Sequence, residues 1–443
     1  MSGIAEVLLN LGYAVSGSDA ADSEVTRRLA ALGARVHVGH DPSLVEGADV
    51  VVTSTAIAAD NPERLAAQAL RIPVIPRAEM LGELMRMKYS IAVAGSHGKT
   101  STTSMIAQVL SGCGLDPTVV IGGRLGMLGS GGKLGSGTVM VAEADESDGS
   151  FLRLFPTIAV VTGIDREHLE HHGGLPELRE AFVQFLVRVP FYGAIVACLD
   201  DEGVQAILPR IDRRVVTYGL SPQADLRAAE IAAEGFSVSF TYRRERQSGR
   251  VRLLTPGRHQ VLNALAALGA ADELGLSLRV AAAALDEFAG ADRRMQRKGE
   301  AAGVLVVDDY GHHPTEIAAT LAALREAVGE RRIVVLFQPH RYSRLQDLFD
   351  EFTRSFYEAD KLVLTDVYAA GEAPRPGVDA EHLAQAIREH GHRDTAYAGP
   401  LADATRATIE ALRGGDVVLT LGAGNVLRAG GEILAALDPG GAA

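Results

Sequence analysis

The chain has 443 residues, a length that predicts about three domains rather than a single core. Hydrophobic residues make up 47% and charged residues 22%, as in an ordinary globular chain, and the net charge of -13 argues against nucleic acid as the main partner. No apolar run approaches the ~20 residues that span a bilayer, and the N-terminus lacks a signal-peptide pattern, so we expect a cytoplasmic protein without a membrane partner.

The first segment, residues 1–89, predicts a helix followed by alternating strands and helices. The helix is expected over 3–11 and the strands over 13–16, 35–38, 49–53 and 72–75. This pattern is typical of a doubly wound, Rossmann-like sheet, in which a strand and a glycine loop normally precede the first helix. Neither is present here. Because that first strand is normally central, we expect its neighbours to carry unpaired backbone groups.

The second segment, residues 90–290, opens with an apolar strand that runs into the glycine loop Gly95-Ser96-His97-Gly98-Lys99-Thr100 and then a helix. Such a loop turns backbone N–H groups toward phosphate oxygens, while Lys99 can reach the β/γ-phosphates and the Thr100 hydroxyl can bind Mg²⁺. The common P-loop has four residues between its glycines, which would place a glycine where Val93 stands. The two-residue gap indicates another family. The alternative is a glycine turn before an ordinary helix.

Further strands of this segment are near-continuous apolar runs, expected over 138–142, 157–161 and 194–198. Such runs indicate parallel strands covered on both faces. Between residues 225 and 254 apolar and polar residues alternate around a polar stretch, which predicts an antiparallel hairpin. Cys113 and Cys198 are interpreted as free structural thiols.

The third segment, residues 291–443, repeats the strand–helix alternation. Its strands are expected over 304–307, 333–337, 362–364 and 417–420. The predicted fold class is therefore α/β with three consecutive domains. These are a Rossmann-like N-terminal domain, a central P-loop ATPase-like parallel sheet with a small antiparallel hairpin region, and a Rossmann-like C-terminal domain.

Acidic and histidine side chains follow two strands of the second segment. The stretch 143–148 holds four acids in six positions, which repel each other unless a cation lies among them. It follows a strand of the same unit as the glycine loop, where a magnesium-binding carboxylate belongs; a solvated acidic loop is the alternative. The stretch 162–172 contains three histidines, of which His171 and His172 are interpreted as surface residues.

Polar and aromatic residues also follow two strands of the third segment, at 308–316 and 338–344. We interpret them as a binding region, with acids for sugar hydroxyls, Tyr310 for a ring face and Arg341 for an anion. Arg293 and Arg294 lie at the boundary between the second and third segments, where either could reach a phosphate as the domains close. A solvated basic pair is the alternative.

Taken in order along nearly the whole chain, these stretches resemble the Mur ligase superfamily, and in particular its alanine-adding branch. The resemblance rests on residues 2–6, 17–19, 60–63, 77–81, 95–100, 143–148, 259–263, 308–316, 338–344 and 422–425. It implies an enzyme of peptidoglycan precursor synthesis that joins L-alanine to the lactoyl carboxylate of UDP-N-acetylmuramate. ATP would phosphorylate the carboxylate, the amine would attack the acyl phosphate, and phosphate would leave. ATP and Mg²⁺ are the implied cofactors, and a monomer or homodimer is expected.

The resemblance also assigns roles to individual residues. Nucleotide binding would involve Gly95, Ser96, His97, Gly98, Lys99, Thr100, Ser101, His259, Asn263, Asp309 and Tyr310. Metal binding would involve Thr100, Glu143 and, for a second metal, His168. Substrate binding would involve Asp19, Ser54, Ala56, His312, His340 and Arg341. The catalytic group would be Lys99, Glu143, His168, Arg294, His312 and Arg341.

One absence favours the alanine-adding branch. Several Mur ligases that add later amino acids use a carbamylated lysine after the metal-binding histidine, and no lysine lies between Lys133 and Lys298 here. The chain departs from the family at four positions. Ser96 replaces Thr, Gly163 and Gln260 each replace Asn, and Met295 replaces Phe.

The family's opening strand and glycine loop, which carry the UDP pyrophosphate, are also missing, and Met1 aligns with the methionine directly after that loop. We therefore expect a chain begun at an internal methionine. Two alternatives to the ligase stay open. One is a catalytically silent protein that binds nucleotide or UDP-muramoyl compounds, and the other is a murein tripeptide ligase.

Overall fold

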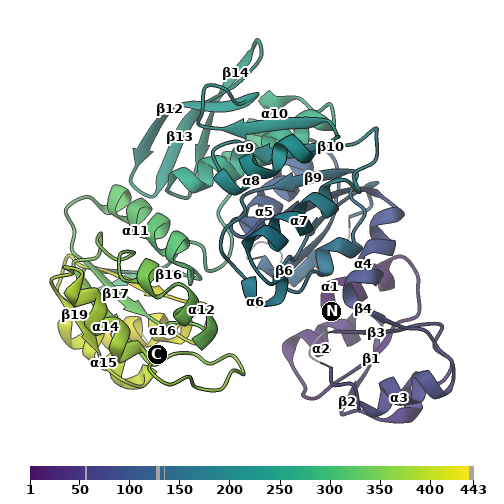
Figure 1. Ribbon diagram of the computed structural model, residues 1–443, viewed down its shortest axis with the longest axis horizontal. Helices are drawn as coiled ribbons and strands as arrows, with labels where there is room; N and C mark the ends of the chain where they lie inside the picture. Colours follow the sequence, from purple (N-terminus) through teal and green to yellow (C-terminus); the bar gives the residue numbers. More distant parts are fainter. Residues whose placement is uncertain (55–56, 126–129, 134, 439–443) are drawn as a thin grey trace. The chain divides into compact units, whose positions relative to one another are not determined.

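The computed structural model, shown in Figure 1, describes residues 1–54, 57–125, 130–133 and 135–438. Its contacts divide the chain into two compact units. The first unit comprises residues 1–229, 241–251 and 262–286, and the second comprises 230–240, 252–261 and 287–443. The expected boundaries after residues 89 and 290 stay a prediction.

The N-terminal part of the first unit contains two separate two-stranded parallel sheets. One pairs β1 (Ser16–Asp19) with β2 (Arg35–Val38), and the other pairs β3 (Val51–Thr53) with β4 (Val74–Pro76). The helices are α1 (Ser2–Asn10), α2 (Glu24–Ala31), α3 (Pro62–Ala69) and α4 (Arg77–Arg86). Among the described residues no ladder joins β1 to β3, which agrees with the expected incomplete pairing in this segment.

The strand expected over 13–16 is wrong by three residues, because the strand forms over Ser16–Asp19. The backbone N–H of Gly12 donates to Leu9 and that of Tyr13 donates to Leu8, so both close the end of α1. The chain becomes free to extend only after this turn. Residues 17–19 therefore lie in the strand.

The next part of the chain forms a ten-stranded sheet in the order β14-β13-β12-β11-β10-β9-β5-β8-β6-β7. Most of this sheet belongs to the first unit, and parts of β12, β13 and β14 belong to the second. Its strands are β5 (Tyr89–Ala94), β6 (Thr118–Leu125), β7 (Ser130–Lys133), β8 (Val139–Glu143), β9 (Ile158–Val161), β10 (Ala194–Cys198), β11 (Val215–Gly219), β12 (Leu226–Glu234), β13 (Ser237–Arg244) and β14 (Gln247–Leu253). The central strand β5 pairs in parallel with β8 on one side and β9 on the other. Their carboxyl ends therefore meet at one edge of the sheet.

Helices pack against this sheet. They are α5 (Lys99–Gly112), α6 (Leu169–His172), α7 (Leu175–Leu186), α8 (Glu202–Ile207), α9 (Arg258–Glu273) and α10 (Leu278–Leu285), with short 3-10 turns at Ser150–Arg153 and Leu208–Arg210. A further 3-10 turn, Pro42–Val45, lies in the N-terminal part beside α3. The fully buried apolar residues of β5, β8 and β9 confirm that these strands are covered on both faces. A Cβ at Gly112 would lie 2.4 Å from the Ala284 methyl, so α5 and α10 approach closely.

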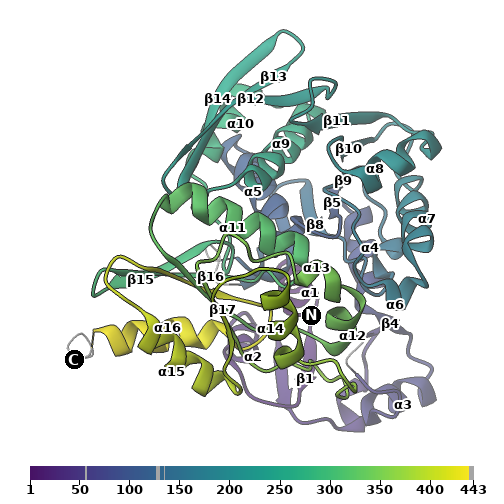
Figure 2. The ribbon, with the colours of Figure 1, turned by 60° about the vertical axis from the view of Figure 1, so that its left-hand side comes forward.

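The predicted hairpin region contains three strands rather than two. β12 and β13 are joined by residues 235–236, and β13 and β14 by residues 245–246. Two-residue connections join only antiparallel neighbours, and Gly235 and Glu245 have the positive φ angles that such turns require. Figures 1 and 2 show the three strands side by side, as the strand order states.

The second unit contains a six-stranded sheet in the order β15-β16-β20-β17-β18-β19. The strands are β15 (Gln296–Ala301), β16 (Val304–Asp309), β17 (Ile333–Phe337), β18 (Lys361–Leu364), β19 (Thr395–Tyr397) and β20 (Val417–Leu421). Only β15 is antiparallel to its neighbour. The four predicted strands of this segment are confirmed, and the two edge strands, β15 and β19, were not predicted.

Helices cover both faces of this second sheet (Figure 2). Alternate residues of β16 point to opposite faces and therefore belong to two different cores. Leu305 and Val307 belong to the core that includes α11 (Pro314–Val328), α12 (Tyr342–Asp347), α13 (Phe349–Phe352) and α14 (Ala380–Glu389). Val304 and Val306 belong to the core that includes α15 (Leu401–Ala411) and α16 (Leu427–Leu437). Among the described residues, no helix is both long and apolar enough to cross a bilayer.

Candidate functional site

The glycine loop lies where the sequence predicts it, between the end of β5 and the start of α5. Gly95 has a φ of +137° and Gly98 a φ of +80°, a backbone region that side chains rarely adopt. A Cβ at Gly95 would lie 2.1 Å from the Thr162 hydroxyl, and one at Gly98 would lie 2.7 Å from Oδ1 of Asn263. Both positions therefore require glycine for conformation and for space.

Lys99, the first residue of α5, points back into the loop. Its Nζ atom lies 2.6 Å from the Gly95 carbonyl oxygen and 3.3 Å from that of Ser96. It also lies 2.8 Å from both carboxylate oxygens of Glu146, whose side chain is 1% exposed. Burial works against the charge of Lys99, but Glu146 and the neighbouring acids outweigh it and raise the pKa of Lys99. The ammonium group therefore stays charged.

The acidic stretch after β8 forms a tight turn rather than a solvated loop. Its start is fixed to the central strand, because the Ala144 N–H donates to the Val93 carbonyl. Burial raises the pKa of Asp145, but hydrogen bonds from Ser147 and the charge of Lys99 outweigh it, so the pKa lies below its usual value. Burial raises the pKa of Glu146 to about 7, although Lys99 opposes this shift. Buried carboxyl groups are thus concentrated beside the glycine loop.

One of the two histidines interpreted as surface residues also supports this turn. His171 is exposed, as expected, whereas His172 is half-buried and its Nε2 donates to the Glu146 carbonyl over 2.7 Å. The interpretation of His172 as a surface residue is therefore wrong. The short helix α6 brings its imidazole to the acidic turn.

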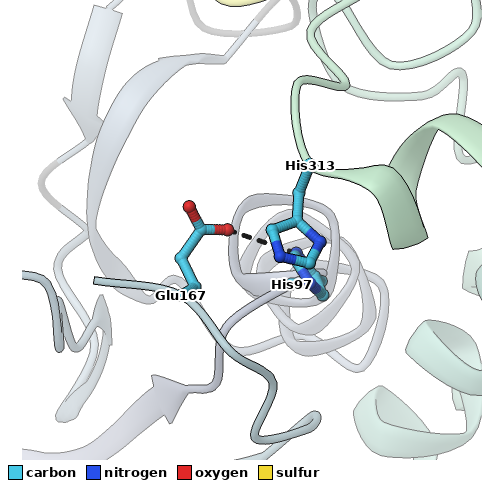
Figure 3. A group of neighbouring side chains, drawn as sticks. All are labelled: His97, Glu167 and His313. Carbon is cyan, nitrogen blue, oxygen red and sulfur yellow. Dashed lines mark ion pairs between the residues drawn. The ribbon is translucent and has the colours of Figure 1, made fainter. Parts of the chain in front are cut away.

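The segment after β9 forms hydrogen bonds with the glycine loop. The Ser96 hydroxyl accepts from the Asp165 N–H at 2.9 Å, and the Ser96 N–H donates to the Gly163 carbonyl at 2.9 Å. His97 Nε2 lies 3.0 Å from Oδ2 of Asp165, and its Nδ1 lies 4.0 Å from the buried carboxylate of Glu167. Figure 3 shows the His97–Glu167 ion pair as a dashed line. Ser96, which departs from the expected Thr, still supplies the hydroxyl that accepts the hydrogen bond from Asp165.

His168 stands at the start of α6 with a φ of +54°. Its Nε2 lies 3.9 Å from Glu167 and its Nδ1 lies 3.9 Å from Glu170, and its charge lowers the pKa of Asp145 as the smallest of several causes. His168 therefore lies near the acidic turn. Its role as a ligand to a second metal stays a prediction.

Two residues expected to contact nucleotide lie inside the protein at this site. Asn263 is 7% exposed, and its Oδ1 accepts from the Thr102 hydroxyl at 3.1 Å. Ser101 is buried in the first turn of α5. The Asn263 amide oxygen also limits the space at Gly98, so this side chain supports the loop from within.

A carboxylate lies close to Gly163. A Cβ at Gly163 would lie 2.8 Å from Oδ2 of Asp201, the residue that begins α8. Oδ1 of Asp201 accepts from the Ile164 and Val204 N–H groups. Burial raises the pKa of Asp201. Asp201 therefore occupies space beside the segment that braces the glycine loop.

In the second unit, two acids end β16 and hold the backbone around them. Asp308 accepts from Nε of Arg293 at 3.0 Å and from the Thr420 hydroxyl at 2.7 Å. Asp309 accepts from the N–H groups of Met295 and Gly311, both at 2.7 Å. Burial raises the pKa of Asp309 to about 6, with Arg294 opposing the shift. Asp309 shapes the turn before α11, and its contact with a nucleoside stays a prediction.

Tyr310 follows these acids and lies among basic groups. The guanidinium carbons of Arg293 and Arg294 lie 4.9 and 5.3 Å from its ring centre. His312 contacts the ring edge-on at 5.3 Å, and the Nδ1 of His312 lies 3.3 Å from Glu316. Arg293 and Arg294 are thus not simply a solvated basic pair, because both lie against Tyr310.

The second polar stretch, after β17, continues the same cluster. The ring centres of His312 and His340 are 5.7 Å apart, and Tyr368 stacks on His340 with an interplanar angle of 8°. Arg344 donates to Nδ1 of His340 at 3.1 Å, which places the ring proton on Nε2. Arg341 begins α12 with a φ of +69°, and its N–H donates to the Tyr368 carbonyl. The predicted substrate residues His312, His340 and Arg341 are therefore neighbours.

The remaining predicted residues belong to other elements, and one of them is outside the described residues. His259 is half-buried in the first turn of α9, and burial, together with the charge of Arg294, lowers its pKa to about 4. Asp19 is exposed in β1, and Ser54 is half-buried just after β3. Ala56 lies outside the described residues.

The donor set of the first unit fits Mg²⁺ with bound phosphates. The Thr100 hydroxyl and the Glu143 carboxylate offer oxygen, which this ion prefers, and Lys99 supplies a charge for phosphate. Glu143 ends β8, and its charge raises the pKa of Lys99, so it lies near the loop. Mg²⁺ held there would offset charge on a transferred phosphoryl group.

The sequence did not single out Glu146, Glu167 or Asp201. One acid ends β8 and three more follow within five residues, and no periodicity tells which carboxylate of a turn points inward. Glu167 was one acid in a histidine-rich stretch. Only the position of Glu167 directly after the segment that hydrogen-bonds to the glycine loop would have suggested a role at this site.

The first unit has a glycine loop between a central parallel strand and a helix, with acids at the next strand end, which is the arrangement of P-loop α/β proteins. Three family models match consecutive parts of the chain. They are "Mur ligase family, catalytic domain" over 1–89, "Mur ligase middle domain" over 93–271 and "Mur ligase, glutamate ligase domain" over 293–424.

Similar proteins cover almost the whole chain. The "UDP-N-acetylmuramate--L-alanine ligase" of Desulfosudis oleivorans is 56% identical over 435 residues, which are 98% of this chain and 95% of the relative. The protein of the same name from Geobacter sulfurreducens is 55% identical over 440 residues, 99% of this chain and 95% of the relative. The chain belongs to the Mur ligase family.

Solved structures show the same fold. The UDP-N-acetylmuramate-alanine ligase MurC of Thermotoga maritima matches with a TM-score of 0.81 and 28% identity, covering 99% of this chain and 96% of that one. A murein peptide ligase of Psychrobacter arcticus matches with a TM-score of 0.70 at 23% identity, covering 99% and 96%. The second likeness is one of fold alone.

Proposed function

We propose that this chain joins L-alanine to the lactoyl carboxylate of UDP-N-acetylmuramate, with conversion of ATP to ADP and phosphate. The observation that carries the proposal is the identity of 53–57% over nearly the full length to enzymes named for this reaction. The chain also has no lysine between Lys133 and Lys298, so a central carbamylated lysine has no place in its mechanism.

The chemistry requires activation of a carboxylate. A carboxylate resists attack by an amine, so its oxygen first takes the γ-phosphoryl group of ATP and ADP leaves. The amine of L-alanine then attacks the acyl carbon and loses a proton, and phosphate leaves with its bonding electron pair. Lys99 and the backbone N–H groups of the glycine loop would hold the phosphates and offset the charge that develops on the transferred group.

Two groups of residues would serve this reaction. In the first unit, Thr100 and Glu143 would hold Mg²⁺, with His168 near a second metal. In the second unit, Arg294, His312, His340 and Arg341 form a cationic and imidazole cluster suited to the carboxylate of an amino acid or to an acyl phosphate.

The test is phosphate release by the purified chain with ATP, Mg²⁺, UDP-N-acetylmuramate and L-alanine, together with mass spectrometry of the product. We expect phosphate and the alanyl product in equal amounts. Absence of turnover from a folded chain that binds ATP would support the silent binding protein instead. Turnover with a murein tripeptide in preference to L-alanine would support the tripeptide ligase.

A further inference from the structure

Lys99 has a complete set of hydrogen-bond partners within the protein. A lysine ammonium has three N–H donors, and here they meet the Gly95 carbonyl, the Ser96 carbonyl and the Glu146 carboxylate. The same ammonium group is the one expected to reach the β/γ-phosphates of ATP. Binding therefore has to replace at least part of this set.

Glu146 is held in place by its backbone. Its carbonyl accepts from Nε2 of His172 at 2.7 Å and from the Gly149 N–H at 3.1 Å. A Cβ at Gly149 would lie 3.2 Å from Nε2 of His171, so the turn is also closely packed. If Lys99 moves toward a phosphate, the backbone of Glu146 stays in place, so its carboxylate can follow only as far as its own side-chain rotations allow.

The charges around the pair make its separation unfavourable. Glu146 is 1% exposed, and Asp145 and Glu143 add negative charge close to Lys99. A buried carboxylate that loses the cation paired with it beside other acids is strongly destabilised. The acidic turn therefore needs a replacement for the positive charge whenever Lys99 leaves.

We propose that Glu146 is a positioning residue that holds Lys99 while nucleotide is absent and releases it only when magnesium enters with ATP. Lys99 then pairs with phosphate, and the acids of the turn pair with the metal instead of Lys99. This inference rests on the proposed ATP site. It adds a reason why the chain would bind ATP with magnesium far better than ATP without it.

The first measurement concerns Lys99 alone and needs no nucleotide. The chain is treated with limiting acetic anhydride, and the labelling of Lys99 is compared by peptide mass spectrometry with that of the exposed Lys298 in the same sample. In Glu146→Gln we expect the relative labelling of Lys99 to rise about tenfold, because a charge-assisted hydrogen bond is lost. Asp148→Asn removes an acid from the same turn and should leave the labelling unchanged.

The second measurement is the affinity for ATP with magnesium and with EDTA, by calorimetry. In Glu146→Gln we expect magnesium-free ATP to bind about tenfold more tightly than in the unmodified chain, so that the dependence on magnesium falls. Glu146→Asp keeps the charge and should restore part of that dependence, and it serves as the second variant if Glu146→Gln does not fold.

Two results would overturn the inference. One is unchanged labelling of Lys99 in Glu146→Gln. The other is an unchanged ratio of the two affinities in a variant that still binds ATP with magnesium. An unmodified chain that binds no ATP under either condition would contradict the proposed function itself, and the labelling result would still decide whether Glu146 holds Lys99.

Discussion

The Nε2 atom of His97 lies 3.0 Å from Oδ2 of Asp165, so an imidazole of the glycine loop is tied to the segment that follows β9. The same aspartate donates its backbone N–H to Ser96. One residue thus fixes two consecutive positions of the loop.

We expect Asp165→Asn to weaken ATP binding by about tenfold, because a charge-assisted hydrogen bond to His97 is replaced by a neutral one. The measurement is calorimetric titration with ATP and magnesium. Glu180→Gln, which removes a surface ion pair with Arg210 in the same unit, is the control and should bind ATP normally. Equal affinities for both variants would contradict this role of Asp165.

Comparing Gly98 with Gly114 distinguishes two effects of replacing a glycine by alanine: strain in the backbone and a steric clash of the added Cβ. Gly98 and Gly114 have nearly the same φ, +80° and +81°, but a Cβ would meet Asn263 at 2.7 Å only at Gly98, and nothing lies within 4 Å at Gly114. Gly114→Ala should lower the free energy of unfolding by about 1 kcal/mol and leave ATP binding intact. Gly98→Ala should also weaken ATP binding more than about tenfold, because the loop must shift. Calorimetry and urea denaturation test both statements.

A second pair of glycines tests the contact between α4 and the 3-10 turn that follows the acidic turn. A Cβ at Gly82 would lie 2.5 Å from the Arg153 carbonyl oxygen, whereas Gly431 in α16 has nothing within 4 Å. We expect Gly82→Ala to lower the free energy of unfolding by roughly 2 kcal/mol through overpacking. Gly431→Ala should raise it by up to about 1 kcal/mol, since alanine favours a helix. If Gly82→Ala were as stable as Gly431→Ala, the close contact would be wrong.

The low pKa of His259 predicts a loss of stability in acid. Its folded value of about 4 lies below that of an unfolded histidine, so the unfolded chain binds the extra proton first as the pH falls. Between pH 6.5 and 5 this group should lower the free energy of unfolding by about 1 to 2 kcal/mol. His259→Gln should lack that part of the loss, measured by urea denaturation without nucleotide. His382→Gln, which removes an exposed imidazole, is the control and should retain it.

The sequence predicted the glycine loop and its flanking strands well, because their signals are local. An apolar strand, glycines and a helix start follow one another within residues 89–112, and the buried strands β8, β9 and β10 are unbroken apolar runs. The predicted start of β1 was wrong because the backbone of Tyr13 hydrogen-bonds to the end of α1, a detail that the hydrophobic pattern does not reveal. The edge strand β15 is polar and half-exposed, so it carries no apolar pattern.

The sequence could predict which strand ends form the candidate site, but not which side chains there form hydrogen bonds and ion pairs with each other. Parallel topology brings the ends of β5, β8 and β9 together, so the residues after them had to be neighbours. Which of them pair depends on turn geometry. Glu146 rather than Glu143 contacts Lys99 at 2.8 Å, and His172 rather than His171 hydrogen-bonds to the acidic turn.

The two small sheets near the N-terminus have a consequence for local motion. In β1–β2 and β3–β4 every strand is an edge strand, so each ladder can open without disturbing the ten-stranded sheet. Two-stranded sheets are also marginal when they stand alone. In heavy water, the backbone amides of β1 and β3 should therefore exchange their hydrogens for deuterium well before those of β5 and β9.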